Sequence, residues 1–316
     1  MKVVGKLTAS GDAGRPHRKR LRSLAFVPTL LTLSNLLCGF AAIHFAARAM
    51  YDFGKGITPE TMMTLQHPLI ERLLPSFLSI GASLVILGMI LDCFDGLIAR
   101  VTTSTTNFGG QLDSLADVVS FGVAPATLMI AFMTKELARD SIVVSPISEH
   151  PWGRFTWVCA ALYVAMAAVR LARFNVEHAE EGFDHRIFRG LPSPAAAAIL
   201  VGLVLFQDHT KVEAIRNALM YTTPVIAMGI AFLMVSRVPY RRIGRSYLMG
   251  RQPFGQFLVV MLVIAVFLAF KAETFLVVAL GYGFSGPVYW ALRKLRDRHS
   301  PVTSVTPATV KDRASA

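Results

Sequence analysis

Long apolar stretches run along most of the chain and are separated by shorter polar segments. A helix needs about 20 apolar residues to cross a hydrocarbon core of about 30 Å. The stretches that approach or reach this length are residues 26–47, 76–98, 117–134, 155–173, 193–207, 218–236, 254–270 and 273–292. The pattern predicts an all-α integral membrane protein, a polytopic helical bundle of about eight transmembrane helices.

The composition agrees with a membrane protein and excludes several other classes. Of the 316 residues, 53% are hydrophobic and 16% are charged, whereas soluble domains carry about 25% charged residues. A disordered chain would be much poorer in apolar residues. The 3 cysteines form no CxxC pair, so we expect neither a disulfide framework nor a zinc site.

Basic residues concentrate on one predicted side of the membrane. The net charge is +12, from 32 Lys and Arg against 20 Asp and Glu. When the N-terminus is placed inside and the spans alternate, most Lys and Arg residues fall on the cytoplasmic side, as the positive-inside rule requires. We therefore expect a multi-pass protein of the cell membrane with cytoplasmic N- and C-termini, contacts with membrane lipids, and no nucleic-acid partner.

Both ends of the chain are predicted to be polar extensions of this bundle. Residues 1–23 form a basic arm without the apolar core of a cleavable signal peptide, and we expect them to be a mobile cytoplasmic segment. Residues 296–316 are rich in Ser, Thr, Pro and charge, which predicts a disordered cytoplasmic tail.

Four aspartates lie near two consecutive predicted helix ends within residues 91–125. Asp92 and Asp95 are three residues apart at the cytoplasmic end of the second span, and Asp113 and Asp117 are four apart at the start of the third. Both spacings place a pair on one helix face. Because a short connection makes the two spans antiparallel, the sequence predicts that all four carboxylates converge at the inner membrane boundary.

A cluster of this kind favours a divalent metal site. Carboxylates crowded in a low dielectric repel one another, and their oxygens favour Mg²⁺, Mn²⁺ or Ca²⁺ over zinc. Four of them can hold two ions about 3.5–4 Å apart, as in phosphoryl-transfer sites. Gly96 and Gly109 leave room for a ligand near the backbone, and Arg100 is suited to phosphate. A lone acidic pair would more often be a helix cap or a solvated face.

The spacing of these residues resembles a known signature. Residues Asp92-x-x-Asp95-Gly96-x-x-Ala99-Arg100, eight further residues and Gly109-x-x-x-Asp113-x-x-x-Asp117 match every fixed position of the CDP-alcohol phosphotransferase motif. The resemblance implies a membrane enzyme with a six-helix catalytic core, usually homodimeric, that uses Mg²⁺ or Mn²⁺ as a pair of ions and no organic cofactor. It would displace CMP from a CDP-linked lipid or alcohol with a hydroxyl acceptor.

Flanking segments narrow the resemblance to one subgroup of this family. They look like the phosphatidylserine synthases, which transfer a phosphatidyl group from CDP-diacylglycerol to the hydroxyl of L-serine and release CMP. The segments are PTLLTLSNLLCGF at 28–40, DSLADVVSFGVAP at 113–125, RLARFN at 170–175 and FRGLPSPAA at 188–196. The resemblance covers about residues 24–240, the expected catalytic membrane core, and leaves 241–295 as additional C-terminal transmembrane helices. Thr29 departs from the Asn common in this subgroup, outside the metal motif.

The resemblance also implies roles for the motif residues. Asp92, Asp95 and Asp113 would be metal ligands. Asp117 would be a ligand, or the general base that takes the hydroxyl proton, or both, so that Asp113 and Asp117 are the catalytic pair. The residues implied around the cytidine and its phosphates are Gly96, Ala99, Arg100 and Gly109.

Four polar residues in other spans have two interpretations each. Thr32 and Asn35 in the first span form hydrogen bonds between helices or, as the resemblance favours, contact the nucleotide. Arg170 and Arg173 at the inner end of the fourth span reach toward water at the interface. Alternatively, they bind the serine carboxylate or a lipid phosphate, because an anion buried without a partner is costly.

Two other functions stay open at the level of sequence. A sister transferase of the same fold would accept glycerol phosphate, inositol phosphate or choline, and the catalytic motif does not separate these acceptors from serine. An ion-coupled transporter would use the aspartates as coupling sites. Transporter sites lie near the bilayer midplane between structural repeats, whereas these acids are predicted at one membrane face and no repeat is evident.

Overall fold

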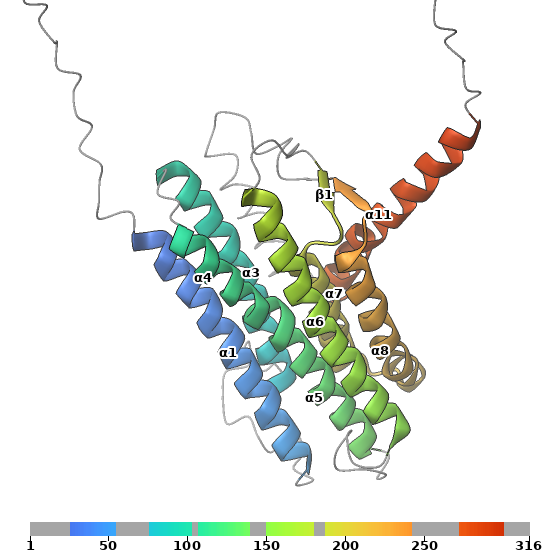
Figure 1. Ribbon diagram of the computed structural model, residues 1–316. Helices are drawn as coiled ribbons and strands as arrows, with labels where there is room; N and C mark the ends of the chain where they lie inside the picture. Colours follow the sequence, from blue (N-terminus) through green and yellow to red (C-terminus); the bar gives the residue numbers. More distant parts are fainter. Residues whose placement is uncertain are drawn as a thin grey trace, which may run out of the picture.

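The computed structural model describes residues 26–54, 76–102, 107–139, 150–179, 187–241 and 272–299. These residues form a bundle of helices with one small pair of strands (Figure 1). In chain order the elements are α1 (Phe26–Gly54), α3 (Phe77–Thr102), α4 (Asn107–Asp117), the π-helix η3 (Val118–Val123), α5 (Ala124–Arg139), α6 (Pro151–Ala179), β1 (Ile187–Arg189), α7 (Ser193–His209), α8 (Glu213–Val235), β2 (Pro239–Arg241) and α11 (Ala272–His299).

The prediction of a polytopic helical membrane protein is confirmed. Within the described residues, 6 helical stretches are long and apolar enough to cross a membrane: Phe26–Asp52, Phe77–Gly96, Phe108–Leu137, Pro151–Val176, Glu213–Val235 and Glu273–Arg296. The expected fifth span is present as the shorter apolar helix α7. The expected span at 254–270 and the arm at 1–23 lie outside the described residues, so the count of about eight is not confirmed. α11 continues to His299, past the expected start of the tail.

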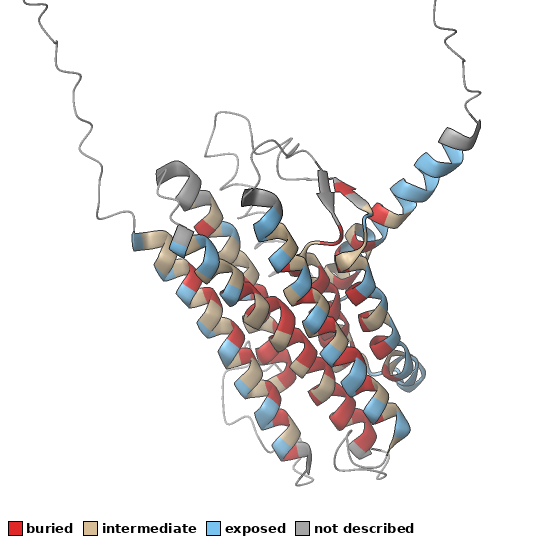
Figure 2. Ribbon diagram, viewed as in Figure 1, coloured by how far each residue is buried: buried red, intermediate tan, exposed pale blue. Residues whose placement is uncertain are grey.

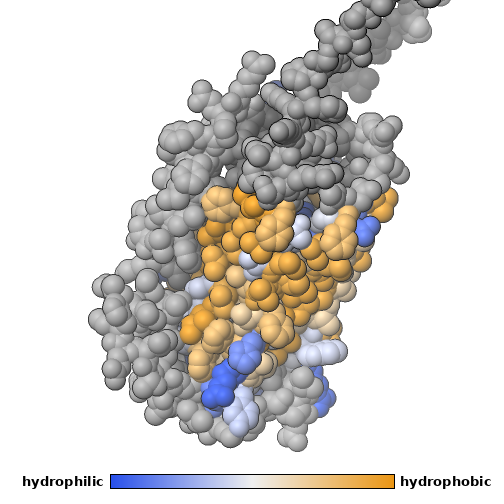
Figure 3. Space-filling model, turned by 90° about the vertical axis from the view of Figure 1, so that its left-hand side faces the viewer, coloured by the Kyte–Doolittle hydropathy of each residue, from blue (hydrophilic) through white to orange (hydrophobic). Residues whose placement is uncertain are grey.

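The stretch from Phe108 to Leu137 is the innermost span of the bundle. Of the 18 most apolar consecutive residues in this span, 67% are buried, against 22% in the spans of α1 and α11. One cluster of buried apolar side chains joins α5 to α1, α3 and α7, and a second joins α5 to α6, α7, α8 and α11. Figure 2 shows the buried residues, in red, gathered in the interior of the bundle. The faces of the outer helices that turn away from these cores carry apolar side chains, which cover the middle of the surface in Figure 3. Such surfaces suit contact with lipid.

The third span begins earlier than the apolar pattern predicts. The sequence placed its start near residue 117, but α4 begins at Asn107 and continues through η3 into α5 as one helical run. Asp113 and Asp117 therefore lie on the second and third turns and not at the helix start. Polar residues such as Asn107, Gln111 and Ser114 lower the hydropathy of this segment, so its helical structure was not visible in the apolar pattern.

A two-stranded antiparallel ladder closes one end of the bundle and was not predicted. Each strand has only three residues, and β1 pairs with β2 in the register Phe188 to Tyr240. Strands this short carry no readable alternation of polar and apolar positions. The turn into α7 depends on Gly190, whose φ is 86° and whose amide donates to the Val238 carbonyl at 2.9 Å.

Gly190→Ala should destabilise the fold. A Cβ there would lie 2.2 Å from the carbonyl oxygen of Met234, and the left-handed backbone disfavours any side chain. We expect the free energy of unfolding to fall by about 1–3 kcal/mol or more, measured as a lower thermal midpoint in detergent. Gly229→Ala in α8 is the matched control, because a Cβ there meets nothing within 4 Å. Equal midpoints for the two variants would contradict this account of the turn.

Candidate active site

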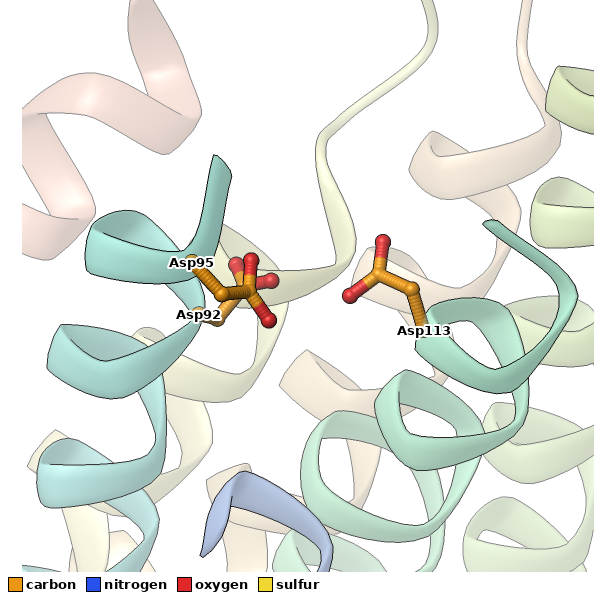
Figure 4. A group of neighbouring side chains, drawn as sticks. All are labelled: Asp92, Asp95 and Asp113. Carbon is orange, nitrogen blue, oxygen red and sulfur yellow. The ribbon is translucent and has the colours of Figure 1, made fainter. Parts of the chain in front are cut away.

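Three of the four motif carboxylates converge at one end of the bundle. Asp92 and Asp95 come from the last turns of α3, and Asp113 faces them from α4 (Figure 4). One oxygen from each of the three carboxylates lies within 4.8 Å of the others. The i,i+3 spacing on α3 and the antiparallel approach of α4 produce this geometry, as the sequence predicts.

Asp117 lies one helical turn further into the bundle. Its side chain is buried, and its Oδ1 accepts a long hydrogen bond from Nδ2 of Asn35 at 3.5 Å. It is outside the group whose oxygens meet within 4.8 Å, although its carboxylate interacts electrostatically with Asp92 and Asp113. The expected convergence of four carboxylates is therefore a cluster of three with the fourth directly behind it.

The chemistry of this cluster fits a hard divalent cation. Oδ1 of Asp113 is buried and has no hydrogen-bond partner among the described residues. Within the same residues, no Lys, Arg or His nitrogen forms an ion pair within 4.0 Å with Asp92, Asp95 or Asp113. Carboxylates held close together without a cation are costly in a low dielectric. They are also the ligands that Mg²⁺ and Mn²⁺ prefer.

α1 supplies two polar side chains that hold the carboxylates from the side. Oγ1 of Thr32 donates to Oδ2 of Asp95 at 2.8 Å and is also 3.0 Å from the carbonyl oxygen of Pro28. Asn35 is fully buried and bonds Asp117 as described above. These contacts correspond to the interhelical hydrogen bonds that the sequence allowed. Nucleotide contact by Thr32 and Asn35 stays a prediction.

Two glycines that the sequence analysis did not single out allow these contacts. A Cβ at Gly88 of α3 would lie 2.7 Å from Oδ1 of Asn35, and one at Gly39 of α1 would lie 2.5 Å from Oγ of Ser120. Ser120 in turn donates to the backbone carbonyl of Asn35 at 2.9 Å. The signal available in the sequence was a glycine inside an apolar helix, which marks close packing of membrane helices but not its partner.

The two arginines at the end of α6 have different surroundings. Nη1 of Arg170 donates to Oγ of Ser193 at 2.6 Å, at the start of α7, and its guanidinium interacts electrostatically with Asp117. Nη1 of Arg173 donates to the carbonyl of Val235, the last residue of α8, at 2.9 Å. Arg170 is thus a cation whose charge acts on Asp117, whereas Arg173 ties α6 to the end of α8.

The remaining motif residues border the cluster. Gly96 follows Asp95, and a Cβ there would meet nothing within 4 Å, so the space beside it is open. Gly109 is half-buried in the first turn of α4. Ala99 and Arg100 lie on the last turns of α3, but their side chains are outside the described part of the chain.

Comparison with known proteins gives the same family throughout. The sequence profile of the CDP-alcohol phosphatidyltransferase family matches residues 25–233. A CDP-diacylglycerol–serine O-phosphatidyltransferase of Helicobacter pylori is 30% identical, over 70% of this chain and 73% of the relative. Proteins of that name from Methanocaldococcus jannaschii (33% identical, over 57% of this chain and 70% of the relative) and Bacillus subtilis (27%, over 68% and 89%) are also similar. The chain belongs to the CDP-alcohol phosphatidyltransferase family.

Proposed function

We propose that this protein is a phosphatidylserine synthase, which transfers the phosphatidyl group of CDP-diacylglycerol to L-serine and releases CMP. The observation that carries the proposal is the meeting of Asp92, Asp95 and Asp113 within 4.8 Å at one end of a membrane bundle of this family. The names of its relatives support serine as the acceptor. The placement of the carboxylates at one end, away from the middle of the bundle, favours a transferase over an ion-coupled transporter.

The reaction exchanges one oxygen on a phosphorus atom for another. The serine hydroxyl oxygen forms a bond to the phosphorus that carries the diacylglycerol. The bond from that phosphorus to the bridging oxygen of CMP breaks, and CMP leaves with the electron pair. The hydroxyl proton passes to a carboxylate. Positioning and charge stabilisation supply most of the rate in phosphoryl transfer.

The motif carboxylates would hold the divalent ions. Asp92, Asp95 and Asp113 are the first candidates, and Asp117 is a further ligand or the base. When bound, Mg²⁺ or Mn²⁺ would neutralise the pyrophosphate and the charge that develops on the departing CMP. Thr32 orients Asp95 through its hydrogen bond, and outer-shell contacts of this kind hold a ligand in its binding geometry.

Asp117 is the carboxylate best placed to take the serine proton. It is outside the tight group of three, so an oxygen is available for the hydroxyl. A general base has to come within hydrogen-bond reach of the proton that it removes. Nδ2 of Asn35 donates to Oδ1 of this carboxylate. Gly96, Ala99, Arg100 and Gly109 are proposed to surround the cytidine and its phosphates.

Arg170 is proposed to bind the carboxylate of the serine substrate. Its guanidinium interacts electrostatically with Asp117, and a substrate anchored at this cation would present its hydroxyl toward the proposed base. Serine carries a carboxylate that cannot be buried without a cation. Ser193 fixes one nitrogen of Arg170 and leaves the other donors of the planar group for the substrate.

We also propose that the active site faces the cytoplasm and that the chain forms a homodimer. The carboxylate cluster is at the end of the bundle where α1 begins, and the basic arm at 1–23 directly precedes α1. The positive-inside rule places that arm in the cytoplasm. The homodimer rests on the resemblance to the family.

An acceptor panel tests the proposed function. We expect purified protein with CDP-diacylglycerol to release CMP with L-serine and with Mg²⁺ or Mn²⁺, and EDTA to stop the release. Glycerol phosphate, inositol phosphate and choline are the control acceptors. CMP release with one of these and none with L-serine would replace serine as the acceptor within the same family. Full activity in EDTA would contradict the metal site.

Asp113→Asn should abolish turnover and weaken Mn²⁺ binding. We expect Mn²⁺ affinity to fall by more than about 100-fold, because removal of an outer-shell partner alone already costs about 10- to 100-fold. Electron paramagnetic resonance of Mn²⁺ without substrates measures this directly. Asp52→Asn is the control, since Asp52 is also buried but pairs with Arg48 at the other end of the bundle. Unchanged Mn²⁺ binding by the Asp113 variant would require a different ligand set.

Arg170→Ala should raise the KM for serine more than the KM for CDP-diacylglycerol. Loss of a hydrogen bond to a charged group corresponds to a rise of about 10- to 100-fold. Steady-state kinetics with each substrate varied in turn would measure it. Arg154→Ala, at the exposed opposite end of α6, is the control. Equal rises for both substrates would count against a serine carboxylate site at Arg170.

A further inference from the structure

A π-helical turn follows Asp117 directly in the innermost span. η3 occupies Val118–Val123 between α4 and α5, and the amide of Ala124 bonds to the carbonyl of Val119, five residues back. Such turns insert an extra residue into an α-helix and are common at functional sites. One inserted residue offsets the faces of the flanking helices by about 100°.

Pro125 explains why the helix takes this turn here. In an α-helix the amide of residue 125 would bond to the carbonyl of Phe121, but proline has no N–H and its ring clashes with that carbonyl. The Phe121 carbonyl therefore needs another donor, because an unpaired carbonyl inside a membrane bundle is costly. The hydroxyl of Tyr163 on α6 supplies it at 2.9 Å.

Tyr163 is fully buried, so it cannot touch a substrate. Its exposed fraction is 0%, as is that of Phe121. Its hydroxyl is the polar end of a side chain otherwise enclosed by the apolar core of α5, α6 and α7. The hydrogen bond to the π-turn is the specific contact that distinguishes this tyrosine from a phenylalanine.

A second contact fixes the same turn from the opposite side. Ser120 of η3 donates to the backbone carbonyl of Asn35, whose side-chain amide reaches Asp117. The close approach at Gly39 allows this contact. Thus α1 and α6 both bond to η3. Asn35 of α1 bonds to the turn through its backbone carbonyl and to Asp117 through its side-chain amide.

From this geometry we infer that Tyr163 is a positioning residue for Asp117. By bonding the Phe121 carbonyl it maintains the π-turn, and the turn sets the angle at which α4 presents Asp117 and Asp113 to the carboxylates of α3. The inference rests on the proposed function only in that Asp117 works on the reacting groups. Tyr163 itself lies outside the motif and outside the flanking segments on which the resemblance rests.

The test removes the hydroxyl and then supplies the missing amide. Tyr163→Phe removes the side-chain hydrogen bond to the Phe121 carbonyl, so we expect a lower thermal midpoint and a kcat lower by about 10- to 100-fold. The KM values should change by less than about twofold. Mn²⁺ binding without substrates should weaken, because the turn also orients Asp113. Tyr221→Phe, at an exposed position of α8, is the matched control.

Pro125→Ala separates positioning from a merely structural role. The substituted alanine has an N–H for the Phe121 carbonyl, so the run can become a regular α-helix. We expect Tyr163→Phe/Pro125→Ala to regain the midpoint lost by Tyr163→Phe while kcat and Mn²⁺ affinity stay low. Pro125→Ala alone should keep its midpoint and lose activity, and it carries the test if Tyr163→Phe does not fold. Recovery of both midpoint and kcat in the double variant would overturn the inference, as would full activity of Pro125→Ala.

Failure of this inference is distinguishable from failure of the proposed function. Wild type is measured with the whole acceptor panel, and if another acceptor works in place of L-serine, the variants are compared with that acceptor. Mn²⁺ binding needs no acceptor, so it decides the effect of Tyr163→Phe on the carboxylates even if wild type transfers to none. Wild-type Mn²⁺ affinity in both Tyr163→Phe and Pro125→Ala would overturn the role of the turn.

Discussion

The repulsion between carboxylates held close together in an apolar bundle constrains this structure more than any other interaction. At the end of the bundle away from the active site, buried acids have cations from the protein itself. Lys135 is 2.6 Å from Asp208, and Arg48 is 3.1 Å from Asp52. Ser76 and Ser79 also donate to Asp208. The carboxylates of Asp92, Asp95 and Asp113 have no such ion pair among the described residues, and this is the arrangement that a divalent ion would stabilise.

α1 forms hydrogen bonds with two of the motif carboxylates and carries exposed apolar side chains on its other face. The buried face of the helix carries Thr32 and Asn35 toward the carboxylates, whereas Leu37 and Phe40 are exposed on the outer face. Because Gly39 and Gly88 have no side chains, α1 approaches η3 and α3 closely enough for these hydrogen bonds. The open space at Gly96 and Gly110 lies at the end of the bundle.

The helical run from α4 through α5 presents different faces to different neighbours along its length. Its first part presents Asp113 and Asp117 to α3, and its second part packs apolar side chains against nearly every other helix. The π-turn lets the two parts have different orientations about the same axis. Pro125 lacks the amide that the Phe121 carbonyl would bind in an α-helix, and the Tyr163 hydroxyl of α6 donates to that carbonyl. Ser120 of the turn donates to a backbone carbonyl of α1. The most deeply buried of the described spans in this way also carries two of the motif carboxylates.

The sequence alone determined the membrane class, six of the long spans and the carboxylate motif. These features depend on properties that are local in sequence: apolar length, and i,i+3 and i,i+4 spacing on a helix. The spacing of Asp92, Asp95 and Asp113 was therefore sufficient to predict that they meet. The early start of α4 and the strands around Gly190 escaped prediction, since polar helical turns and three-residue strands have no periodic signal.

Only the tertiary structure decided which residues support the motif. That Asp117 stands behind the other three carboxylates depends on the turn after it, and the turn depends on Tyr163, which is 42 residues from its partner Phe121. The contact from Thr32 to Asp95 spans 63 residues. Arg170 and Arg173 look alike in the sequence, yet the first interacts electrostatically with Asp117 and the second binds the carbonyl at a helix end. Partners of this kind are selected by how helices pack, and a single sequence records the donors and acceptors but not which of them meet.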